Sequence, residues 1–353
     1  MSLRLTAALL VLLLASAPRQ ADATSFNPYP VDGVDNGPPV GIQIRLRVVQ
    51  IQIFHDHGDQ LPDGRAIGSG TGLGRDGVLV RRAELGVAGG APLGARYLVV
   101  ADLVASPVLR DAFIEIGAEP KFQLRVGQFR LPFGLETQLP PYKLPAINRM
   151  LMTFPGEQPD EVPGLLQEWD RGLALLGEPI SGPLNVSYAL AVVNGTGPNA
   201  PDSNDGKDLV GRVGLRLAGY QLGTSWYRGR APNLAGLDRP RTRVGWDLEI
   251  HPNPLNALLI RGELIHGRDD ATAFRGWYLL ATYAVTDHWV PLIRIERLDP
   301  DRTVAADTLG RTTLGLTYTH SEQLAVSANY EYRRAPALPG VDNLAVVQIQ
   351  ISF

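Results

Sequence analysis

The stretch Val347-Gln-Ile-Gln-Ile-Ser-Phe353, at the end of the chain, decides the fold. In it Val347, Ile349, Ile351 and Phe353 alternate with Gln348, Gln350 and Ser352. Because a strand side chain changes face at every residue, this strand has one apolar and one polar face. Chain ends are usually frayed and exposed, so a large apolar last residue indicates an anchored end. The pattern recurs along the chain and predicts a closed barrel with lipid outside and water inside.

Sixteen segments have the length and the alternation of tilted barrel strands. They lie near 41–54, 78–90, 93–105, 109–118, 121–131, 169–178, 183–194, 208–218, 220–230, 240–251, 255–267, 274–286, 288–299, 309–320, 322–334 and 342–353. The expected fold is therefore all-β, a transmembrane antiparallel β-barrel of about sixteen strands. An even strand number is what a single-chain bacterial barrel requires if both termini lie on one side.

The connections alternate in length. Tight turns are expected at 89–92, 118–120, 179–182, 219, 252–254, 287 and 320–321, and longer links at 55–77, 132–168, 195–207, 231–239, 268–273, 300–308 and 335–341. One further link, 106–108, occupies the place of a long link in this alternation but is short. This alternation is typical of outer-membrane barrels, which have loops outside and turns in the periplasm. A soluble sandwich gives no reason for it.

Most strands keep one face polar, with both signs of charge. In the second strand, for example, Ala83 and Leu85 oppose Arg82 and Glu84. Strands six, nine and twelve have apolar or small residues on both faces, and the first changes phase at Val48–Val49, which predicts a bulge. Aromatic residues fall near strand ends and suit interfacial girdles: Tyr97, Trp226, Trp277, Tyr283, Trp289, Tyr318, Tyr330, Tyr332 and Phe353.

The first 23 residues are expected to be a signal peptide, with residues 24–353 forming the barrel. Arg4 precedes an apolar run from Leu5 to Ala17, and Ala21-Asp22-Ala23 fits a small-x-small cleavage site. The alternative, an uncleaved anchor, is disfavoured because the run is too short to span a bilayer as a helix. There is no cysteine, so an exported chain must be held by other means, such as a closed hydrogen-bond ladder.

The charge balance argues against nucleic acid as a partner, because the formal net charge is −3. Basic residues are nearly all arginine: only Lys121, Lys143 and Lys207 are lysine among 33. Arginine keeps its charge in any environment and binds carboxylates and phosphates with a planar set of donors. A GC-rich genome gives the same bias without any function.

Residues 125–136, Arg-Val-Gly-Gln-Phe-Arg-Leu-Pro-Phe-Gly-Leu-Glu, resemble the phosphate-selective porin O and P family. In that family a strand ending in Gly-Gln-Phe leads into a Pro-Phe-Gly-Leu-Glu turn before the long third loop. Arg81-Arg82-Ala-Glu-Leu-Gly86 is similar to its double-arginine second strand, and Asp111-Ala-Phe113 to its fourth strand. The close match covers residues 78–137.

The resemblance implies a sixteen-stranded trimeric porin of the bacterial outer membrane, in some members anion-selective. It also favours an inward course for 132–168, as a constriction loop, over the alternatives of an extracellular cap or a subunit contact. The family's phosphate-specific members use lysines near the mouth and constriction, where this chain has few. We expect Phe353 to be recognised by the barrel-assembly machinery.

The candidate pore-lining residues are charged side chains on the polar faces. Arg45, Arg47, Arg82, Arg96 and Arg125 are expected to form an arginine stripe, which would lower the barrier for anions. Alternatively, Glu84, Asp102, Asp111 and Glu115 pair with these arginines and cancel most of the field. In the long link, Lys143 and Arg149 compete in the same way with Glu157, Asp160, Glu161 and Glu168.

Other motifs favour no chemistry, so no catalytic residue, cofactor or metal is expected. His55-Asp56-His57 with Asp59 suggests a metal site, but two histidines on a loop do not define one, and a solvated loop is the better interpretation. The glycines at 68, 70, 72 and 74 lack a following Lys-Ser/Thr and a helix, so they do not make a phosphate cradle. The Gly-x-Ser-x-Gly elbow is absent.

The favoured function is passive diffusion of small hydrophilic solutes and ions through a water-filled channel, with an anion or phosphate preference. An outer-membrane enzyme or a dedicated uptake channel for an organic solute is a second hypothesis. An enzyme would need a nucleophile–base pair on the wall, and the sequence indicates none. A secreted β-rich binding protein is a third hypothesis, which cell fractionation distinguishes.

Overall fold

The computed structural model describes residues 41–56, 75–91, 95–105, 107–119, 121–153, 168–180, 182–202, 204–232, 238–252, 257–305, 307–334 and 343–353. The expected signal peptide, His57, Asp59 and the glycines at 68–74 lie outside these residues, as do Glu157, Asp160 and Glu161. Of Arg45 only the backbone is described.

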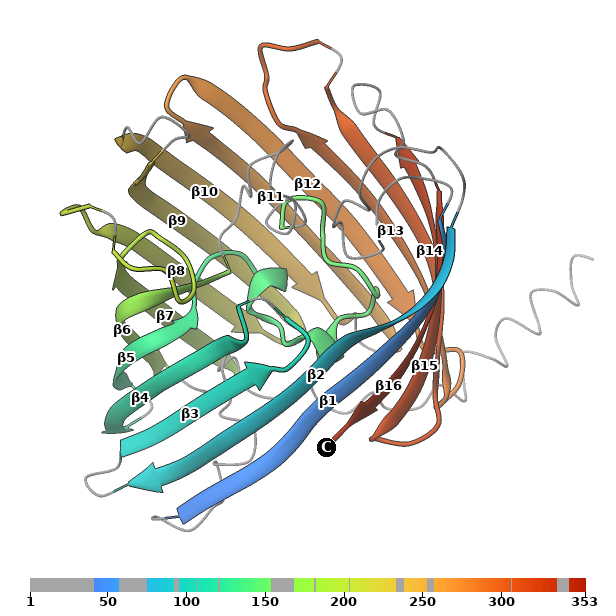
Figure 1. Ribbon diagram of the computed structural model, residues 1–353, viewed down its shortest axis with the longest axis horizontal. Coiled ribbons are helices and arrows are strands. Elements are labelled where there is room, and N and C mark those ends of the chain that lie inside the picture. Colours follow the sequence, from blue (N-terminus) through green and yellow to red (C-terminus); the bar gives the residue numbers. More distant parts are fainter. Residues whose placement is uncertain are drawn as a thin grey trace, which may run out of the picture.

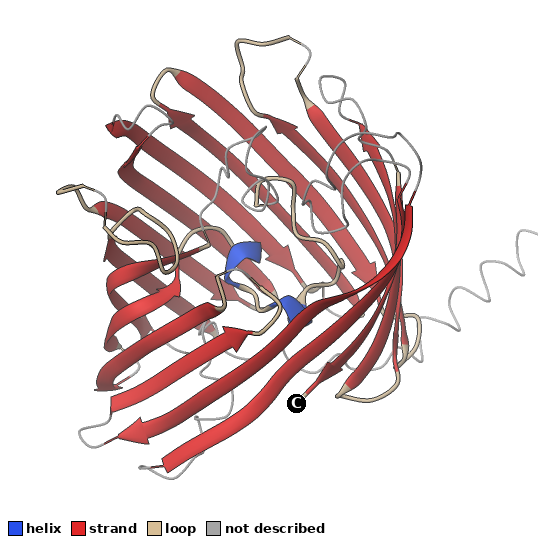
Figure 2. Cartoon of the chain, viewed as in Figure 1, coloured by secondary structure: helices blue, strands red, loops and turns tan. Residues whose placement is uncertain are grey.

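Sixteen strands make up the described chain. They are β1 (Gly41–Asp56), β2 (Arg75–Ala91), β3 (Ala95–Asp102), β4 (Leu109–Glu119), β5 (Phe122–Arg130), β6 (Trp169–Ile180), β7 (Leu184–Val193), β8 (Asp208–Leu217), β9 (Tyr220–Pro232), β10 (Asp238–Ile250), β11 (Leu258–Asp269), β12 (Thr272–Tyr283), β13 (Trp289–Asp299), β14 (Leu309–Thr319), β15 (Leu324–Arg334) and β16 (Leu344–Ser352). Two 3₁₀ turns, η2 (Glu136–Gln138) and η3 (Pro141–Lys143), lie inside the ring of strands (Figure 2). No helix of the described residues has the length and apolar character to cross a bilayer.

The strands form one closed antiparallel barrel, which confirms the expected fold class (Figure 1). Each strand pairs with its sequence neighbours, and β1 closes the ring by pairing with β16. On the inner side of this seam the Gln50 amide donates to Gln350 at 2.7 Å, and Gln52 donates to Gln348 at 2.8 Å. The N–H of Phe353 donates to the carbonyl of Arg47 at 3.1 Å, so the chain end is anchored.

Alternation sorts the side chains between the two surfaces of the barrel. On β16, Ile351 is 40% exposed whereas Gln348 is 6% exposed. Exposed large apolar residues lie on the outer surface of every strand except β11, while most charged residues near the middle of the strands are buried on the inner side. This is the arrangement that the alternating sequence predicts.

Three expectations about local structure need correction. The link at 268–273 is wrong, because β11 and β12 continue until only Asp270 and Ala271 separate them, with Asp270 at φ 54°. The third strand ends at Asp102 rather than at 105, since the Asp102 carboxylate accepts from the N–H groups of Ala83 (3.1 Å) and Val104 (3.4 Å). The register shift in β1 lies between Leu46 and Val48, one residue before the expected bulge.

Candidate functional site: an internal loop and the charged wall it faces

The segment after β5 turns into the barrel and crosses it (Figure 1). The inward course expected for 132–168 is confirmed for the part through Thr153, and residues 154–167 are outside the described chain. From Leu131 to Gln138 every residue is buried, although this is a link and not a strand. Its polar backbone therefore needs partners on the wall, and it finds them on strands far away in the sequence.

The first attachment is a backbone turn that holds the Glu263 carboxylate of β11. The N–H groups of Leu135 and Glu136 donate to Glu263 at 2.8 Å and 2.6 Å, and the Tyr278 hydroxyl of β12 donates at 2.9 Å. Gly134 has φ +72°, and a Cβ there would meet the same carboxylate at 2.8 Å. The Pro-Phe-Gly-Leu-Glu motif thus supplies a turn whose amide groups converge on one anion.

The second attachment lies further along the loop. Glu136 accepts from the N–H of Met150 at 2.6 Å and lies 3.5 Å from Arg294 of β13. The N–H of Leu151 donates to Glu296 of β13 at 2.9 Å. Asn148 donates to Glu331 of β15 at 2.9 Å. These contacts fix the returning part of the loop to β13 and β15.

The third attachment is at the β1–β16 seam. Arg47 of β1 donates to the Tyr142 hydroxyl at 3.4 Å, and Gln350 of β16 donates to the Tyr142 carbonyl at 3.2 Å. Nearby, Ile147 of the loop packs against an apolar cluster made of Phe54, Leu79, Leu344 and Val346. The loop therefore reaches the side of the barrel where the ring closes.

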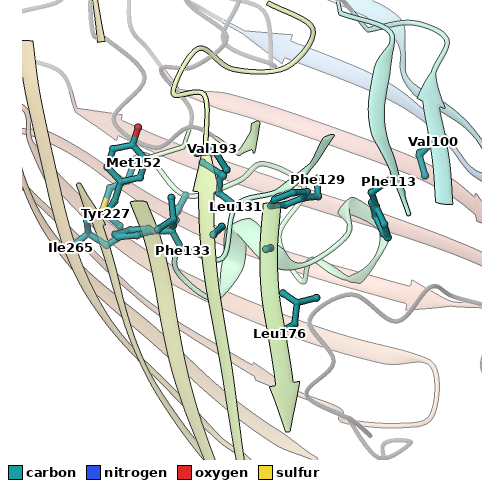
Figure 3. Packing of buried hydrophobic residues seen from close by; sticks show 14 of the residues in the cluster. Val100, Phe113, Phe129, Leu131, Phe133, Met152, Leu176, Val193, Tyr227 and Ile265 are labelled. Carbon is teal, nitrogen blue, oxygen red and sulfur yellow. The ribbon is translucent and has the colours of Figure 1, made fainter. Parts of the chain in front are cut away.

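An apolar cluster fills the space between the root of the loop and the wall (Figure 3). Phe129, Leu131 and Phe133 extend from the end of β5, and each is at most 4% exposed. They pack with inward residues of the wall and with Met152, and Figure 3 shows Phe133 beside Ile265. Burial of this kind contributes about 25 cal/mol per Å² of apolar surface, so part of the barrel interior is a dry protein core.

Buried ion pairs tie strands together beneath this core. Arg212 of β8 forms an ion pair with Asp247 of β10, in which Nη2 of Arg212 donates to Oδ1 of Asp247 at 2.8 Å. Both side chains are at most 2% exposed. The pair crosses over β9 at Gly223, where an added Cβ would collide with both partners. Arg311 of β14 pairs in the same way with Glu296 of β13.

Apart from Arg45, whose side chain is not described, the candidate arginines lie on the inner side of β1, β2, β3 and β5, each next to a carboxylate. The separations are 4.0 Å for Arg47–Glu84, 3.6 Å for Arg82–Asp102 and 2.6 Å for Arg125–Glu115, and Arg96 also pairs with Glu115. The described arginines therefore have carboxylate neighbours, as the alternative of paired charges expects, and a pore-lining role for the row stays a prediction. Arg125 is fully buried and has become a structural residue.

The partners in these pairs differ in exposure. The side chain of Arg47 is 17% exposed against 6% for Glu84, and that of Arg96 is 21% exposed against 1% for Glu115. The side chain of Arg110, which lies 4.0 Å from Asp102, is 14% exposed against 1% for that carboxylate. In these three pairs the arginine is more accessible than its carboxylate partner, whereas Arg125 and Glu115 are both covered.

The loop residues behave differently. Lys143 is exposed on η3, and Arg149 lies 2.8 Å from Glu168. Burial lowers the pKa of Arg149 to about 10, although the attraction of Glu168 raises it. Burial would also raise the pKa of Glu168, but attraction first by Arg149 and then by Arg130 outweighs it, so that pKa lies below its ordinary value.

Sequence reasoning missed a stacked group at the root of the loop. Arg130 lies 3.9 Å and Arg110 5.0 Å from the ring centre of Trp169, whose indole N–H donates to Asp111 at 3.2 Å. Arg130 also donates to the carbonyl of Thr137 at 2.6 Å. A usable signal was present for the apolar cluster: strands six and twelve have apolar residues on both faces, and β6 and β12 are where it packs.

No metal centre accompanies these residues: within the described part of the chain, no three His, Cys, Asp or Glu residues are grouped to hold an ion. His55 is exposed at the end of β1, and the other residues proposed with it have no described side chains.

Solved structures share this architecture, whereas no protein-family model and no curated protein sequence matches the chain. An anion-selective porin from Comamonas acidovorans superposes with a TM-score of 0.63 at 13% identity, covering 89% of this chain and 100% of that one. OmpF of Salmonella typhi gives 0.63 at 12% identity over 89% and 98%. OmpT of Vibrio cholerae in a trimer form gives 0.56 at 11% identity over 90% and 100%. The chain therefore has the fold of bacterial outer-membrane porins.

Proposed function

We propose that the chain is an outer-membrane porin, a non-enzymatic channel for passive diffusion of small hydrophilic solutes and ions. One observation carries this proposal: a closed barrel with an apolar outer surface holds an internal loop fixed to β11, β13 and the β1–β16 seam. Only helices and closed barrels satisfy all backbone groups in lipid. A loop that narrows such a barrel limits solute size, and wall charge then selects among the ions that fit.

The uneven exposure of the ion pairs supports a weak anion preference. Arg47, Arg96 and Arg110 reach the lumen while their carboxylate partners are covered, and exposed Lys143 lies on the loop itself. Glu168 opposes this balance, since its side chain is 18% exposed. A small excess of accessible positive charge lowers the barrier for chloride or phosphate without making a specific site.

A planar-bilayer experiment tests both parts. Reconstituted protein is expected to give stepwise conductance, and a potassium chloride gradient a reversal potential that favours chloride. Arg96→Gln should move that potential toward cations, whereas Arg228→Gln, which removes an exposed arginine from the outer surface of β9, should leave it unchanged. Added phosphate, tested as a blocker, measures any preference for that anion. Absence of conductance would refute the channel, and a cation-favouring potential would refute the selectivity alone.

Further parts of the proposal rest on the sequence and on the porin fold. Residues 1–23 serve as a signal peptide, and the mature barrel resides in the outer membrane as a homotrimer. Phe353, 63% exposed on the outer surface, presents the terminal aromatic group for the barrel-assembly machinery. Affiliation with the phosphate-selective porin O and P family is supported by the motifs in 78–137. Cross-linking of the folded protein tests the trimer.

A further inference from the structure

Exposed arginines gather on the outer surface at the long-link end of β9 to β15. They are Arg228, Arg230, Arg268, Arg275, Arg297 and Arg334. Each occupies a position that alternation turns away from the lumen, because its strand neighbours on either side are inward-facing or its same-face neighbours are exposed apolar residues. Arginine is unexpected there, since a basic side chain at the lipid midplane of a barrel costs roughly 2–4 kcal/mol, falling to near zero at the interfaces.

The level of these arginines is set by their neighbours on the same face. Trp226 lies two residues before Arg228, Trp277 two after Arg275, and Tyr332 two before Arg334, each toward the middle of its strand. Tryptophan and tyrosine prefer the headgroup level of a bilayer. Arg228, Arg275 and Arg334 therefore lie one outward-facing position beyond that level, where lipid phosphate groups are found, and Arg297 is paired directly with Trp277.

Strand register arranges four of the arginines as two clasps. Thr242 of β10 is paired with Arg228 on one side and with Arg268 on the other. Gly310 of β14 is paired with Arg297 on one side and with Arg334 on the other (strands in Figure 1). Neighbouring strands are about 4.8 Å apart. The Cα atoms of the two arginines in each clasp therefore lie roughly 10 Å apart, with a small residue between them.

No described carboxylate forms an ion pair with a clasp arginine. Among the outward-facing strand residues whose side chains the structure describes, the one carboxylate is Asp299, directly opposite Arg275. Asp238 of β10 and Asp76 of β2 also occupy outward-facing positions, and their side chains lie outside the described part of the chain. Arg302, exposed in the adjoining link, adds a positive charge beside β12, where its N–H donates to Ala273 at 2.9 Å. The lumen contrasts with this surface, since its arginines are next to carboxylates. At the same end of β1 to β8, the described outward basic groups are His55 and half-buried Arg171.

We propose that these two clasps bind the phosphate groups of phosphorylated lipids in the leaflet at the long-link end of the barrel. Charge complementarity and the level beyond the aromatic residues favour lipid over any soluble partner. Arginine binds phosphate through two parallel donors, and two such groups flanking a small residue suit a headgroup with more than one phosphate. This inference rests on the proposed membrane location. It adds that the side of the barrel formed by β9 to β15 faces lipid rather than a neighbouring protein.

Binding of lipid A, a bis-phosphorylated glycolipid, to the detergent-solubilised full-length protein tests the proposal. The variants are Arg228→Gln with Arg268→Gln, and Arg297→Gln with Arg334→Gln. The control double variant Lys121→Gln with Arg239→Gln removes the same charge from exposed positions outside the clasps. A basic residue near an anionic lipid surface contributes roughly 1 kcal/mol, so each clasp variant should bind about 30-fold more weakly. The control should bind as the wild type does.

The outcomes separate this inference from the channel proposal. Equal binding by wild type, clasp variants and control, or equal weakening by the control, overturns the clasps. Displacement of lipid A by the same concentration of inorganic phosphate also overturns the lipid assignment, because it indicates a general anion site. Every variant is first shown to conduct in a bilayer, which proves folding and tests the channel by itself. Wild-type protein that binds lipid A but does not conduct would support the clasps and refute the channel.

Discussion

Removing the Glu263 carboxylate should release the internal loop without unfolding the barrel. In Glu263→Ala, two loop N–H groups and the Tyr278 hydroxyl lose their acceptor in a site where Glu263 is 3% exposed. Each buried donor left unpaired costs about 1–3 kcal/mol. Because the losses are not additive, we expect loop opening to become easier by about 3 kcal/mol, which corresponds to roughly 100-fold in the opening equilibrium.

Because the chain has no cysteine, opening of the internal loop can be measured with one engineered thiol. Gln138 is 2% exposed and its amide donates within the loop, to Gly134, so Gln138→Cys places a single thiol in the protected segment. Labelling with a water-soluble maleimide then reports opening. The thiol should react about 100-fold faster in the Glu263→Ala background if opening limits labelling.

Two controls bracket the result. Tyr278→Phe removes one donor and leaves the carboxylate bound to the loop, so labelling should rise less than tenfold. Glu322→Ala, at an exposed turn, should not change it. Equal labelling rates with and without Glu263, in protein that migrates as a folded barrel on an unboiled gel, would show that the carboxylate does not hold the loop.

Two further predictions concern stability, measured as the temperature at which the folded band is lost on gels. Gly223→Ala should destabilise the barrel by about 1–3 kcal/mol, because the new methyl group displaces the buried Arg212–Asp247 ion pair. Gly310→Ala should be neutral, since the nearest neighbour of its added Cβ is at 3.9 Å. Equal effects of the two substitutions would argue against an ion pair that crosses β9. The lowered pKa of Glu168 means that its stabilising contribution is present above its ordinary pKa, about 4.3, and is lost as pH falls through the lower folded value. Glu168→Gln should therefore flatten the loss of stability below about pH 4, with Glu322→Gln as control, and an unchanged pH profile would contradict the assignment.

The strands were predictable because the barrel leaves few choices. Period-two alternation places one face in lipid and one in the interior, and the tight turns then fix the order. The errors lie where side chains compete with the ladder. Asp102 captures backbone N–H groups and ends β3 early, and β11 and β12 extend as a hairpin because Asp270 adopts a left-handed turn conformation.

The site was only partly predictable, because its contacts join residues far apart in the sequence. The inward-facing arginines follow from alternation, but their partners depend on strand register, which sets Glu115 opposite Arg125 and Arg96. That Glu263 would hold the loop is invisible in the sequence, since a carboxylate on the polar face is expected to meet water. The apolar inner residues of β6 and β12 were visible as weak alternation, and they now have a physical cause in the packing of the loop.

The distribution of burial, rather than the number of arginines, decides the field inside the barrel. Where both partners are covered, as in Arg311 and Glu296 at 1% each, the opposite charges lie close together and their combined field decays quickly with distance. Such a pair is costly to break but adds little to permeation. Where only the arginine reaches water, as at Arg96, its charge acts on a passing ion at short range. The barrel therefore separates two uses of the same residue type: one side is a structural interior and the other is a charged wall.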